Sequence, residues 1–243
     1  MNEKVFSSQE EMGIAIADEI CALPEINKNP LICLAAGHSS LPVFQELVSR
    51  RRQGFDFSSW SFVAMDEWAG MSSIDSESCG GFLLKNLLDH VNISRQNTRL
   101  FDGKTACAGC DPAAECASVE KFIAEKGGID FMLLGIGMNG HLALNEPGCD
   151  INAGARFTEL SETTKTVGQK YFSSGMALTG GLTLGLKNIL AARSIIVNVC
   201  GEHKAPVVKQ LREIASCDTS FPAAVLKDVP YVKFYFDRDS SRQ

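Results

Sequence analysis

The sequence predicts a three-layer αβα sandwich with a mainly parallel, Rossmann-like central sheet, formed by a single domain over residues 1–243. Three observations support this prediction. Apolar strand-like runs alternate with segments of helical periodicity, which is typical of a parallel sheet with helices on both faces. Three of the runs are almost wholly apolar, as expected for strands that are covered on both sides. No linker rich in Pro, Gly and Ser divides the chain.

Apolar runs and segments of helical periodicity place the elements in order along the chain. The expected strands are Leu31–Ala36, Ser61–Met65, Asp130–Leu134, Ser194–Cys200 and Tyr231–Phe236. The expected helices are Ser8–Leu23, Leu41–Gln53, Ser78–His90, Pro112–Lys126, Thr183–Leu190 and His203–Ala215. Ser8 and Glu11 resemble a capping box. Pro42 fits the first turn of its helix, where proline is tolerated. The polar tail, Asp237–Gln243, is expected to fray.

Composition and charge narrow the class of protein. Hydrophobic residues make up 45% and charged residues 21% of the chain, which is ordinary for a globular domain. A net charge of −6 argues against nucleic-acid partners, and the longest basic run, Arg50–Arg52, falls where cations complement a helix C-terminus. No signal-like N-terminus and no run of about 18 apolar residues is present, so no membrane partner is expected. We therefore expect a cytoplasmic protein with reduced thiols.

The nine cysteines form no disulfide framework. One pair, Cys107 and Cys110, has the CxxC spacing, and Cys116 follows six residues later. A second CxxC or a His-x-His pair does not follow, so we expect neither a zinc site nor a redox pair, but loop thiols.

Polar residues follow the first two expected strands. Ala35–Pro42 places Gly37 and two serines between a strand and a helix, where free N–H groups can cradle a phosphate. GxGxxG and the Walker lysine are absent, so a dinucleotide or nucleoside triphosphate is not expected, and an ordinary βα turn is the alternative. After the second strand, Asp66 and Glu67 are adjacent carboxylates. One of them suits a general base; the alternative is a cap for the next helix.

Two further strand ends carry ionisable side chains. In Gly135–Gly148, glycines surround His141 and Glu146, which suit an acid/base pair, and His141 is expected to begin a short helix that ends near Glu146. Near Gly201, Lys204 falls in the first turn of an expected helix. A cation is unfavourable there, which indicates an anion to bind.

Four segments together resemble the glucosamine-6-phosphate deaminase/isomerase family over Leu31 to about Pro222. They are Gly37-His-Ser-Ser40, Met65-Asp-Glu-Trp68, Gly140-His-Leu-Ala-Leu-Asn-Glu-Pro147 and Gly201-Glu-His-Lys-Ala205. Asn139-Gly-His and the segment Gly181–Lys187 are closer to the galactosamine-6-phosphate deaminase/isomerase branch. The resemblance implies a sugar-phosphate isomerase/CoA-transferase-like fold. It also implies conversion of an amino-hexose 6-phosphate to a 6-phospho-ketose and ammonia, with no cofactor or metal.

The resemblance also implies the role of each site residue. His141 assists opening of the sugar ring, Glu146 orients His141, and Asp66 abstracts the proton at C2. Asn139 stands where glucosamine-type members usually carry Asp, in the set that opens the ring. The phosphate is bound by Gly37–Ser40 and Lys204, and Lys170 lies near the position of an arginine that binds the same phosphate.

Two departures from the family pattern bear on specificity and assembly. His38 replaces a small residue in the phosphate loop, so it contacts either the phosphate or the 4-hydroxyl. The chain is shorter at its C-terminus than the hexameric, allosterically activated members, which leaves a homo-oligomer open but puts that regulation in doubt.

Three alternatives compete with this interpretation. A 6-phosphogluconolactonase shares the fold but generally carries Phe-Pro where this chain has Asn145-Glu-Pro147. A non-catalytic sugar-phosphate-binding protein normally carries a helix-turn-helix module, and about seven residues precede the first expected helix here. A phosphosugar isomerase that releases no ammonia could use the same Asp66 chemistry.

Overall fold

The computed structural model describes residues 1–106, 111–173, 175 and 177–242. A seven-stranded sheet, in the order β1-β10-β9-β6-β2-β3-β5, forms the centre of the molecule, and every neighbouring pair is parallel. Its strands are β1 (Glu3–Phe6), β2 (Leu31–Leu34), β3 (Ser61–Val63), β5 (Thr98–Arg99), β6 (Phe131–Leu134), β9 (Ile195–Val199) and β10 (Val232–Asp237). The predicted parallel sheet is confirmed.

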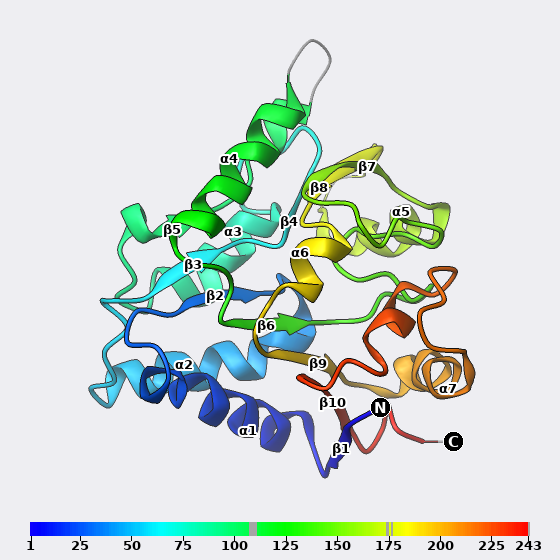
Figure 1. Cartoon of the computed structure of the whole chain (residues 1–243), viewed down its shortest axis with the longest axis horizontal. Coiled ribbons are helices and arrows are strands. Elements are labelled where there is room, and N and C mark those ends of the chain that lie inside the picture. The colour runs from blue at the N-terminus through cyan, green and yellow to red at the C-terminus, as the bar shows by residue number, and fades with distance from the viewer. Residues whose placement is uncertain (107–110, 174, 176, 243) are drawn as a thin grey trace.

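Helices cover both faces of this sheet, which completes the predicted three layers. They are α1 (Gln9–Cys21), α2 (Leu41–Arg52), α3 (Cys79–Leu83, continued by a π-helical turn at Leu84–Leu88), α4 (Pro112–Glu125), α5 (Glu162–Gly168), α6 (Leu186–Leu190) and α7 (Ala205–Glu213). Figure 1 shows α1 and α2 on one face, with α4 and α6 on the other. The Ser8 hydroxyl accepts a hydrogen bond from the Glu11 amide at 3.2 Å, which is one half of the predicted capping box. The other half is wrong, because the Glu11 carboxylate accepts from the amide of Ser7 and not from that of Ser8.

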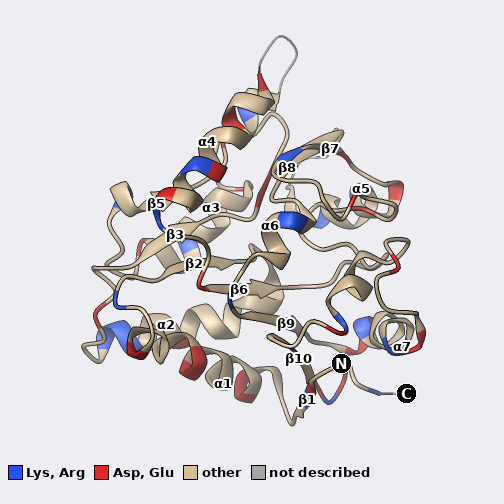
Figure 2. Cartoon of the chain, in the orientation of Figure 1, with Lys and Arg blue, Asp and Glu red and all other residues tan. Residues whose placement is uncertain are grey.

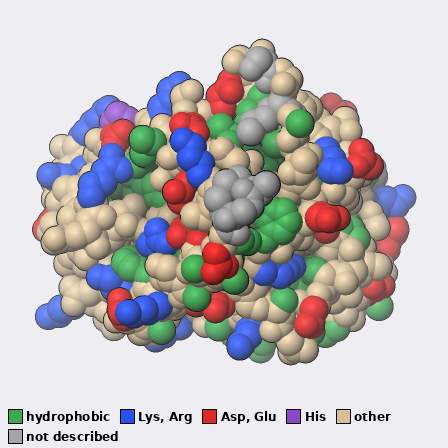
Figure 3. Space-filling model, turned by 90° about the horizontal axis from the view of Figure 1, so that it is seen from above, with side chains coloured by type: hydrophobic (Ala, Val, Ile, Leu, Met, Phe, Trp, Pro, Cys, Tyr) green, Lys and Arg blue, Asp and Glu red, His purple; other side chains and the backbone are tan. Residues whose placement is uncertain are grey.

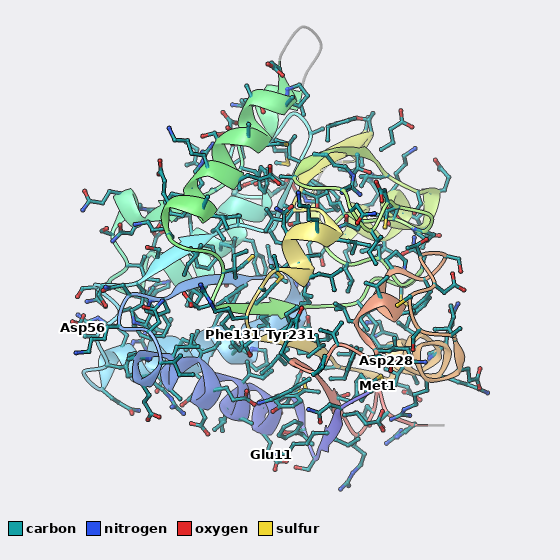
Figure 4. The ribbon with its side chains drawn as sticks, viewed as in Figure 1. Met1, Glu11, Asp56, Phe131, Asp228 and Tyr231 are labelled. Atoms are coloured by element: carbon teal, nitrogen blue, oxygen red, sulfur yellow. The ribbon has the colours of Figure 1, made fainter. Side chains whose placement is uncertain are left out.

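The apolar runs form the centre of the core. All residues of β2, β6 and β9 are buried, because each strand has neighbours on both sides and helices on both faces. Phe131 and Tyr231, labelled in Figure 4, mark the amino ends of β6 and β10, which lie at the same edge of the sheet. The carboxyl ends point toward the opposite side, where α5 and α7 lie (Figure 1).

A second, three-stranded sheet was not predicted from the sequence. It is antiparallel, in the order β4-β8-β7, with β4 at Asp66–Trp68, β8 at Gly180–Thr183 and β7 at Arg156–Glu159. The prediction that Thr183 begins a helix is therefore wrong: Thr183 ends β8, and α6 begins at Leu186. Glycine lets β8 approach β4 here, since a Cβ on Gly181 would lie 2.7 Å from the Glu67 carbonyl oxygen.

Both ends of the described chain pair with the sheet. β1 pairs with β10, which brings the N-terminus near the C-terminus (Figure 1). The expected fraying of the tail is wrong as far as Ser240. Asp237 ends β10, and its carboxylate accepts hydrogen bonds from the amides of Gly201 and Ser240. The fully buried Ser240 hydroxyl also donates to the Val199 carbonyl at 2.8 Å.

Charged side chains of both signs share the same helices, as on α2 and α4 in Figure 2. They are also interspersed over the visible part of the face in Figure 3. Among the described residues, no helix is long and apolar enough to cross a membrane.

Candidate active site

A cavity of about 410 Å³ lies at the point where the strand order reverses. From β2 the chain proceeds outward through β3 to β5, and then returns to β6 on the other side of β2. Ligands of open α/β sheets bind at this switch point, outside the carboxyl ends of the strands. Most of the predicted site residues line the cavity: Gly37, His38, Ser39, Asp66, His141, Lys170 and Lys204. Asn139, Glu146 and Ser40 do not line it.

Asn139 links the predicted pair of His141 and Glu146. The carboxylate of Glu146 accepts a hydrogen bond from the Asn139 side-chain nitrogen at 2.8 Å. The Asn139 side-chain oxygen lies 2.7 Å from Nδ1 of His141. Nδ1 of His141 and Oε2 of Glu146 are themselves 3.9 Å apart. Glu146 therefore orients the imidazole mainly through the Asn139 amide.

These contacts determine which ring nitrogen of His141 carries the proton. A carboxylate only accepts hydrogen bonds, so the Asn139 nitrogen must face Glu146 and its oxygen must face His141. Nδ1 of neutral His141 is then the protonated nitrogen. Nε2 retains its lone pair for a proton of the substrate.

Two residues that the sequence analysis missed support this arrangement. The Ser161 hydroxyl accepts from the Asn139 amide at 3.0 Å, and the Thr164 hydroxyl lies 3.1 Å from Nδ1 of His141. Ser161 is also the N-cap of α5, and its hydroxyl accepts from the Thr164 amide. The spacing Ser-x-x-Thr before a short helix was the signal available in the sequence.

The site favours the neutral form of His141 and the charged form of Glu146. Burial lowers the pKa of His141 to about 4; Lys204 acts in the same direction, and Glu146 opposes them. Burial acts to raise the pKa of Glu146, but hydrogen bonds from Thr164 and Asn139 outweigh it and the pKa is lowered. A neutral imidazole therefore stands beside a charged carboxylate at neutral pH.

The backbone around His141 is not helical, so the predicted short helix is wrong. Residues 139–145 form turns, with a bridge between Leu142 and Asn145, and Ala143 has a φ of 53°. The His141 ring lies over Gly137, where an added Cβ would come within 2.1 Å of a ring atom. Glycine is therefore required at residue 137 by close approach of the ring.

Of the two adjacent acidic residues, Asp66 has the position expected of a general base, and Glu67 has that of a cap for the next helix. Asp66 lines the cavity, whereas Glu67 points away from it and is 1% exposed. Glu67 accepts hydrogen bonds from the amides of Cys79 and Gly80, at the start of α3. Successive side chains of a strand point to opposite faces, and Asp66 and Glu67 are successive residues of β4.

The environment of Asp66 suits a general base. Burial raises its pKa to about 6, although a hydrogen bond from the Cys79 thiol acts to lower it. Asp66 is therefore largely ionised at pH 7 and more basic than an exposed aspartate.

Two lysines give another part of the cavity a positive charge. Lys204 is the N-cap of α7, and its ammonium donates to the Ile136 carbonyl at 2.5 Å. Burial and the nearby Lys170 lower the pKa of Lys204 to about 8. Two cations that repel each other in a buried site favour a bound anion, which is the chemistry expected of Lys204 from the sequence.

The β2–α2 loop approaches the same cavity. Gly37 has extended backbone, and a Cβ placed on it would meet no atom within 4 Å, so its missing side chain leaves open space. Asn198 of β9 supports the loop by donating to the Ser39 carbonyl at 2.8 Å. Ser40 is fully buried at the N-terminus of α2.

His38 packs against aromatic rings of two other elements. Its imidazole stacks on Tyr171, with ring centroids 5.5 Å apart and an interplanar angle of 13°. Phe82 meets it edge-on at 6.0 Å. The Lys170 ammonium lies 5.1 Å from the centroid of the Tyr171 ring. Tyr171 thus joins the β2–α2 loop to the segment that carries Lys170.

Within the described ranges, no group of three or more His, Cys, Asp or Glu side chains could hold a metal ion. Cys107 and Cys110 of the CxxC pair lie outside the described residues.

Comparison with known proteins agrees with the family inferred from the four motifs. Residues 8–232 match the family of glucosamine-6-phosphate isomerases and 6-phosphogluconolactonases. A glucosamine-6-phosphate deaminase of Clostridium perfringens is 33% identical over 98% of this chain and 97% of its own length. One from Bacillus pumilus is 31% identical over 99% and 98% of the two chains.

Solved structures agree with the fold. A monomeric glucosamine-6-phosphate deaminase superposes with a TM-score of 0.92 at 26% identity, covering 99% of this chain and 98% of that chain. The 6-phosphogluconolactonase of Thermotoga maritima shares the fold at a TM-score of 0.74 and 18% identity, over 97% and 98% of the chains. The chain therefore belongs to the family of glucosamine-6-phosphate isomerases and 6-phosphogluconolactonases.

Proposed function

We propose that this protein is an enzyme that isomerises and deaminates an amino-hexose 6-phosphate, releasing a 6-phospho-ketose and ammonia. One observation carries the proposal. A carboxylate and a neutral imidazole, Asp66 and His141, share a single cavity with the paired cations Lys170 and Lys204. Such a site can hold a phosphate and move protons on the sugar that is attached to it. The relatives named glucosamine-6-phosphate deaminases support the same reaction class.

The phosphate binds to Lys204, Lys170 and the Gly37–Ser40 loop in this proposal. The Lys204 ammonium donates to the Ile136 carbonyl, a neutral acceptor. A phosphate oxygen is a stronger partner because charge-assisted hydrogen bonds are roughly twice as strong as neutral ones. Anchoring the phosphate fixes the sugar in the cavity.

His141 opens the sugar ring. Its Nε2 lone pair takes the proton of the anomeric hydroxyl and returns it to the ring oxygen as the C1–O5 bond breaks, which leaves a free aldehyde. Asn139 and Glu146 hold the ring in the required tautomer throughout. The low pKa of His141 keeps the imidazole neutral before each cycle.

Asp66 then moves the proton at C2. The carboxylate removes this proton, the electron pair forms the C1–C2 double bond, and the carbonyl oxygen at C1 takes up the displaced π pair and a proton, which gives an enolamine. Reprotonation at C1 gives the imine at C2. Addition of water and departure of ammonia leave the 2-ketose. The amine and carbonyl of the substrate stabilise the charge, so no cofactor takes part in this scheme.

The configuration at C4 of the sugar distinguishes glucosamine 6-phosphate from galactosamine 6-phosphate as the substrate. The relatives from Clostridium perfringens and Bacillus pumilus are named for glucosamine 6-phosphate, whereas Asn139 and Gly181–Lys187 resemble the galactosamine branch. Both epimers are therefore candidate substrates, and we expect one of them to give the higher kcat/KM.

Ammonium release tests the proposal. Purified protein is incubated with glucosamine 6-phosphate, with galactosamine 6-phosphate and with 6-phosphogluconolactone. Release of ammonium from at least one amino sugar is the expected result. Hydrolysis of the lactone without ammonium from either amino sugar would replace the proposal with a lactonase. Ketose formation without ammonium would indicate an isomerase only.

A further inference from the structure

The turn at Asp237–Ser241, where β10 ends, is hydrogen-bonded to the segment that carries Lys204. The Asp237 carboxylate is 6% exposed, and its two oxygens accept from the Gly201 amide at 3.1 and 3.0 Å. The first of these oxygens also accepts from the Ser240 amide at 2.8 Å. One buried carboxylate therefore links the end of β10 to the backbone just beyond β9.

Two further contacts hold the turn in place. The Ser241 amide donates to the Asp237 carbonyl at 3.1 Å, which closes the turn. The Ser240 hydroxyl donates to the Val199 carbonyl at 2.8 Å, and Ser240 is fully buried, so water does not compete for this hydrogen bond. The turn is thus bound to the last residue of β9 as well as to Gly201.

The same turn also contacts the far end of α7. Arg212, in the last turn of this helix, donates to the Ser241 hydroxyl at 2.9 Å and to the Ser241 carbonyl at 3.3 Å. α7 begins directly after Lys204. The turn at Asp237–Ser241 therefore holds α7 at one end through Arg212 and holds the segment before its other end through Gly201.

Gly201 transmits this constraint to Lys204. It has a φ of 89°, a conformation that favours glycine. Its carbonyl accepts from the Lys204 amide at 2.9 Å, which closes the 3₁₀ turn Glu202–Lys204. The Lys204 ammonium then reaches the carbonyl of Ile136, a residue that lines the cavity, at 2.5 Å. Asp237 and Lys204 are therefore joined through the N–H and the C=O of a single residue.

We propose that Asp237 is a positioning residue for phosphate binding, which holds the Gly201 amide and thereby directs the Lys204 ammonium at the phosphate. The inference deepens the proposed function and rests on Lys204 as a ligand of that phosphate. Asp237 does not line the cavity, so it acts on the phosphate through this backbone segment. Ordering a long side chain such as lysine costs conformational entropy when it binds. A fixed backbone reduces that cost because fewer bonds remain to be ordered.

The test measures binding of inorganic phosphate by calorimetry in Asp237→Ala and Asp237→Asn. Asp237→Ala removes the acceptors but leaves the charge of Lys204, so Kd should rise about 3- to 10-fold, as expected when a charged hydrogen bond is weakened and not lost. In the unsubstituted protein, one carboxylate oxygen accepts from both Gly201 and Ser240. The amide oxygen of Asp237→Asn can do the same and should keep Kd within about twofold.

Asp130→Ala is the matched control. Asp130 is also 6% exposed and accepts a backbone hydrogen bond, from the Leu31 amide at 2.8 Å. It directly precedes β6, at the opposite edge of the sheet, and does not line the cavity. The control should lose thermal stability, as Asp237→Ala does, but keep the Kd of the unsubstituted protein.

A double substitution shows whether Asp237 acts through Lys204. In a Lys204→Met background, Asp237→Ala should change Kd by less than about twofold, because two substitutions that affect one contact are not additive. Ammonium release gives a second readout. Asp237→Ala should raise KM by the same factor as Kd and leave kcat within about twofold, which is the mark of lost ground-state binding.

An unchanged Kd in Asp237→Ala would overturn the proposal. Equal rises in the Ala and Asn variants, or an undiminished rise in the Lys204→Met background, would overturn it as well. If Asp237→Ala does not fold, Asp237→Glu is measured in its place. This variant keeps the charge but lengthens the side chain by one methylene, and the same rise in Kd is expected.

Failure of the proposed function gives a different result. If the unsubstituted protein binds phosphate but releases no ammonium from any amino sugar, the proposed function fails, and calorimetry still decides the role of Asp237. If the unsubstituted protein binds no phosphate, Lys204 is not a phosphate ligand, and the inference about Asp237 is overturned with it.

Discussion

Replacement of Asn139 by aspartate tests the relay between Glu146 and His141. The Asn139 oxygen is 2.7 Å from Nδ1 of His141, and its nitrogen is 2.8 Å from the Glu146 carboxylate. Asn139→Asp preserves the shape of the side chain but places a negative charge beside the imidazole. It also removes the N–H groups that bind Glu146 and Ser161. Two carboxylates then face each other behind His141.

The expected change follows from the geometry. Two unit charges about 4 Å apart interact by about 4 kcal/mol at an effective dielectric constant of 20, and an opposite charge this close shifts a pKa by about 1 to 3 units. The new carboxylate favours the charged imidazolium, so the pKa of His141 should rise from about 4 to a value near that of Asp66, which is about 6.

The consequence is visible in the pH profile. In the unsubstituted protein, His141 is already neutral at the pH where Asp66 ionises, so one proton controls the acid limb of kcat/KM. In Asn139→Asp, Asp66 and His141 must each lose a proton in the same pH range. The logarithm of kcat/KM should then fall with a slope approaching about 2, in place of about 1, as the pH decreases.

Ammonium release measured across pH 4 to 8, together with an NMR titration of the His141 ring, checks both statements. Asn152→Asp is the matched control, since it adds the same charge at an exposed residue that does not line the cavity. An imidazole that titrates at the same pH in Asn139→Asp as in the unsubstituted protein would refute the relay.

The remaining predictions concern the base, the phosphate and the turn beneath His141. Asp66→Asn should abolish exchange of the C2 proton with deuterated solvent and lower ammonium release by about 10²- to 10⁴-fold. Binding of inorganic phosphate, measured by calorimetry, should persist in this variant. Retained exchange would show that another residue is the base. Lys204→Met should raise KM about 10- to 100-fold through loss of a charged hydrogen bond. In the unsubstituted protein, KM should rise above about pH 8 as Lys204 loses its proton, and steady-state kinetics showing the same rise in Lys204→Met would contradict this assignment. Gly137→Ala should lower kcat at least about 100-fold, because the added Cβ would overlap the His141 ring and a displacement of about 1 Å lowers the rate by about that factor. An unchanged kcat in the same assay would show that the ring does not occupy this position in the reaction.

The apolar strands were predictable because burial on both faces requires long apolar runs. β2, β6 and β9 are buried at every residue, and each lies within a strand expected from the sequence. The segments that follow β2 and β6, with Gly37 in the first and four glycines in the second, pointed to the cavity for a reason that is also local. Chain reversal at a strand end and close approach of backbone to a ligand both require small residues.

The second sheet could not be predicted because its pairing is not local. β4 and β8 are separated by more than a hundred residues, and each is three or four residues long. Such short segments carry no clear periodicity. β7 alternates between half-buried and exposed residues, and its register depends on β8. Only the packed structure selects these partners.

The sequence by itself determined the parallel sheet, the order of the four polar segments and the residue types that a proton-transfer site with a phosphate needs. Those properties depend on hydrophobic runs, glycines and side-chain chemistry, all of which are local. The tertiary structure decided that Asp66 faces the cavity while Glu67 fastens α3, and that Asn139 transmits the orientation of Glu146 to His141. It also joined Ser161, Thr164 and Cys79 to the site. The physical reason is that the direction of a side chain and its hydrogen-bond partners depend on segments distant in sequence, which only the folded chain brings within a few ångströms.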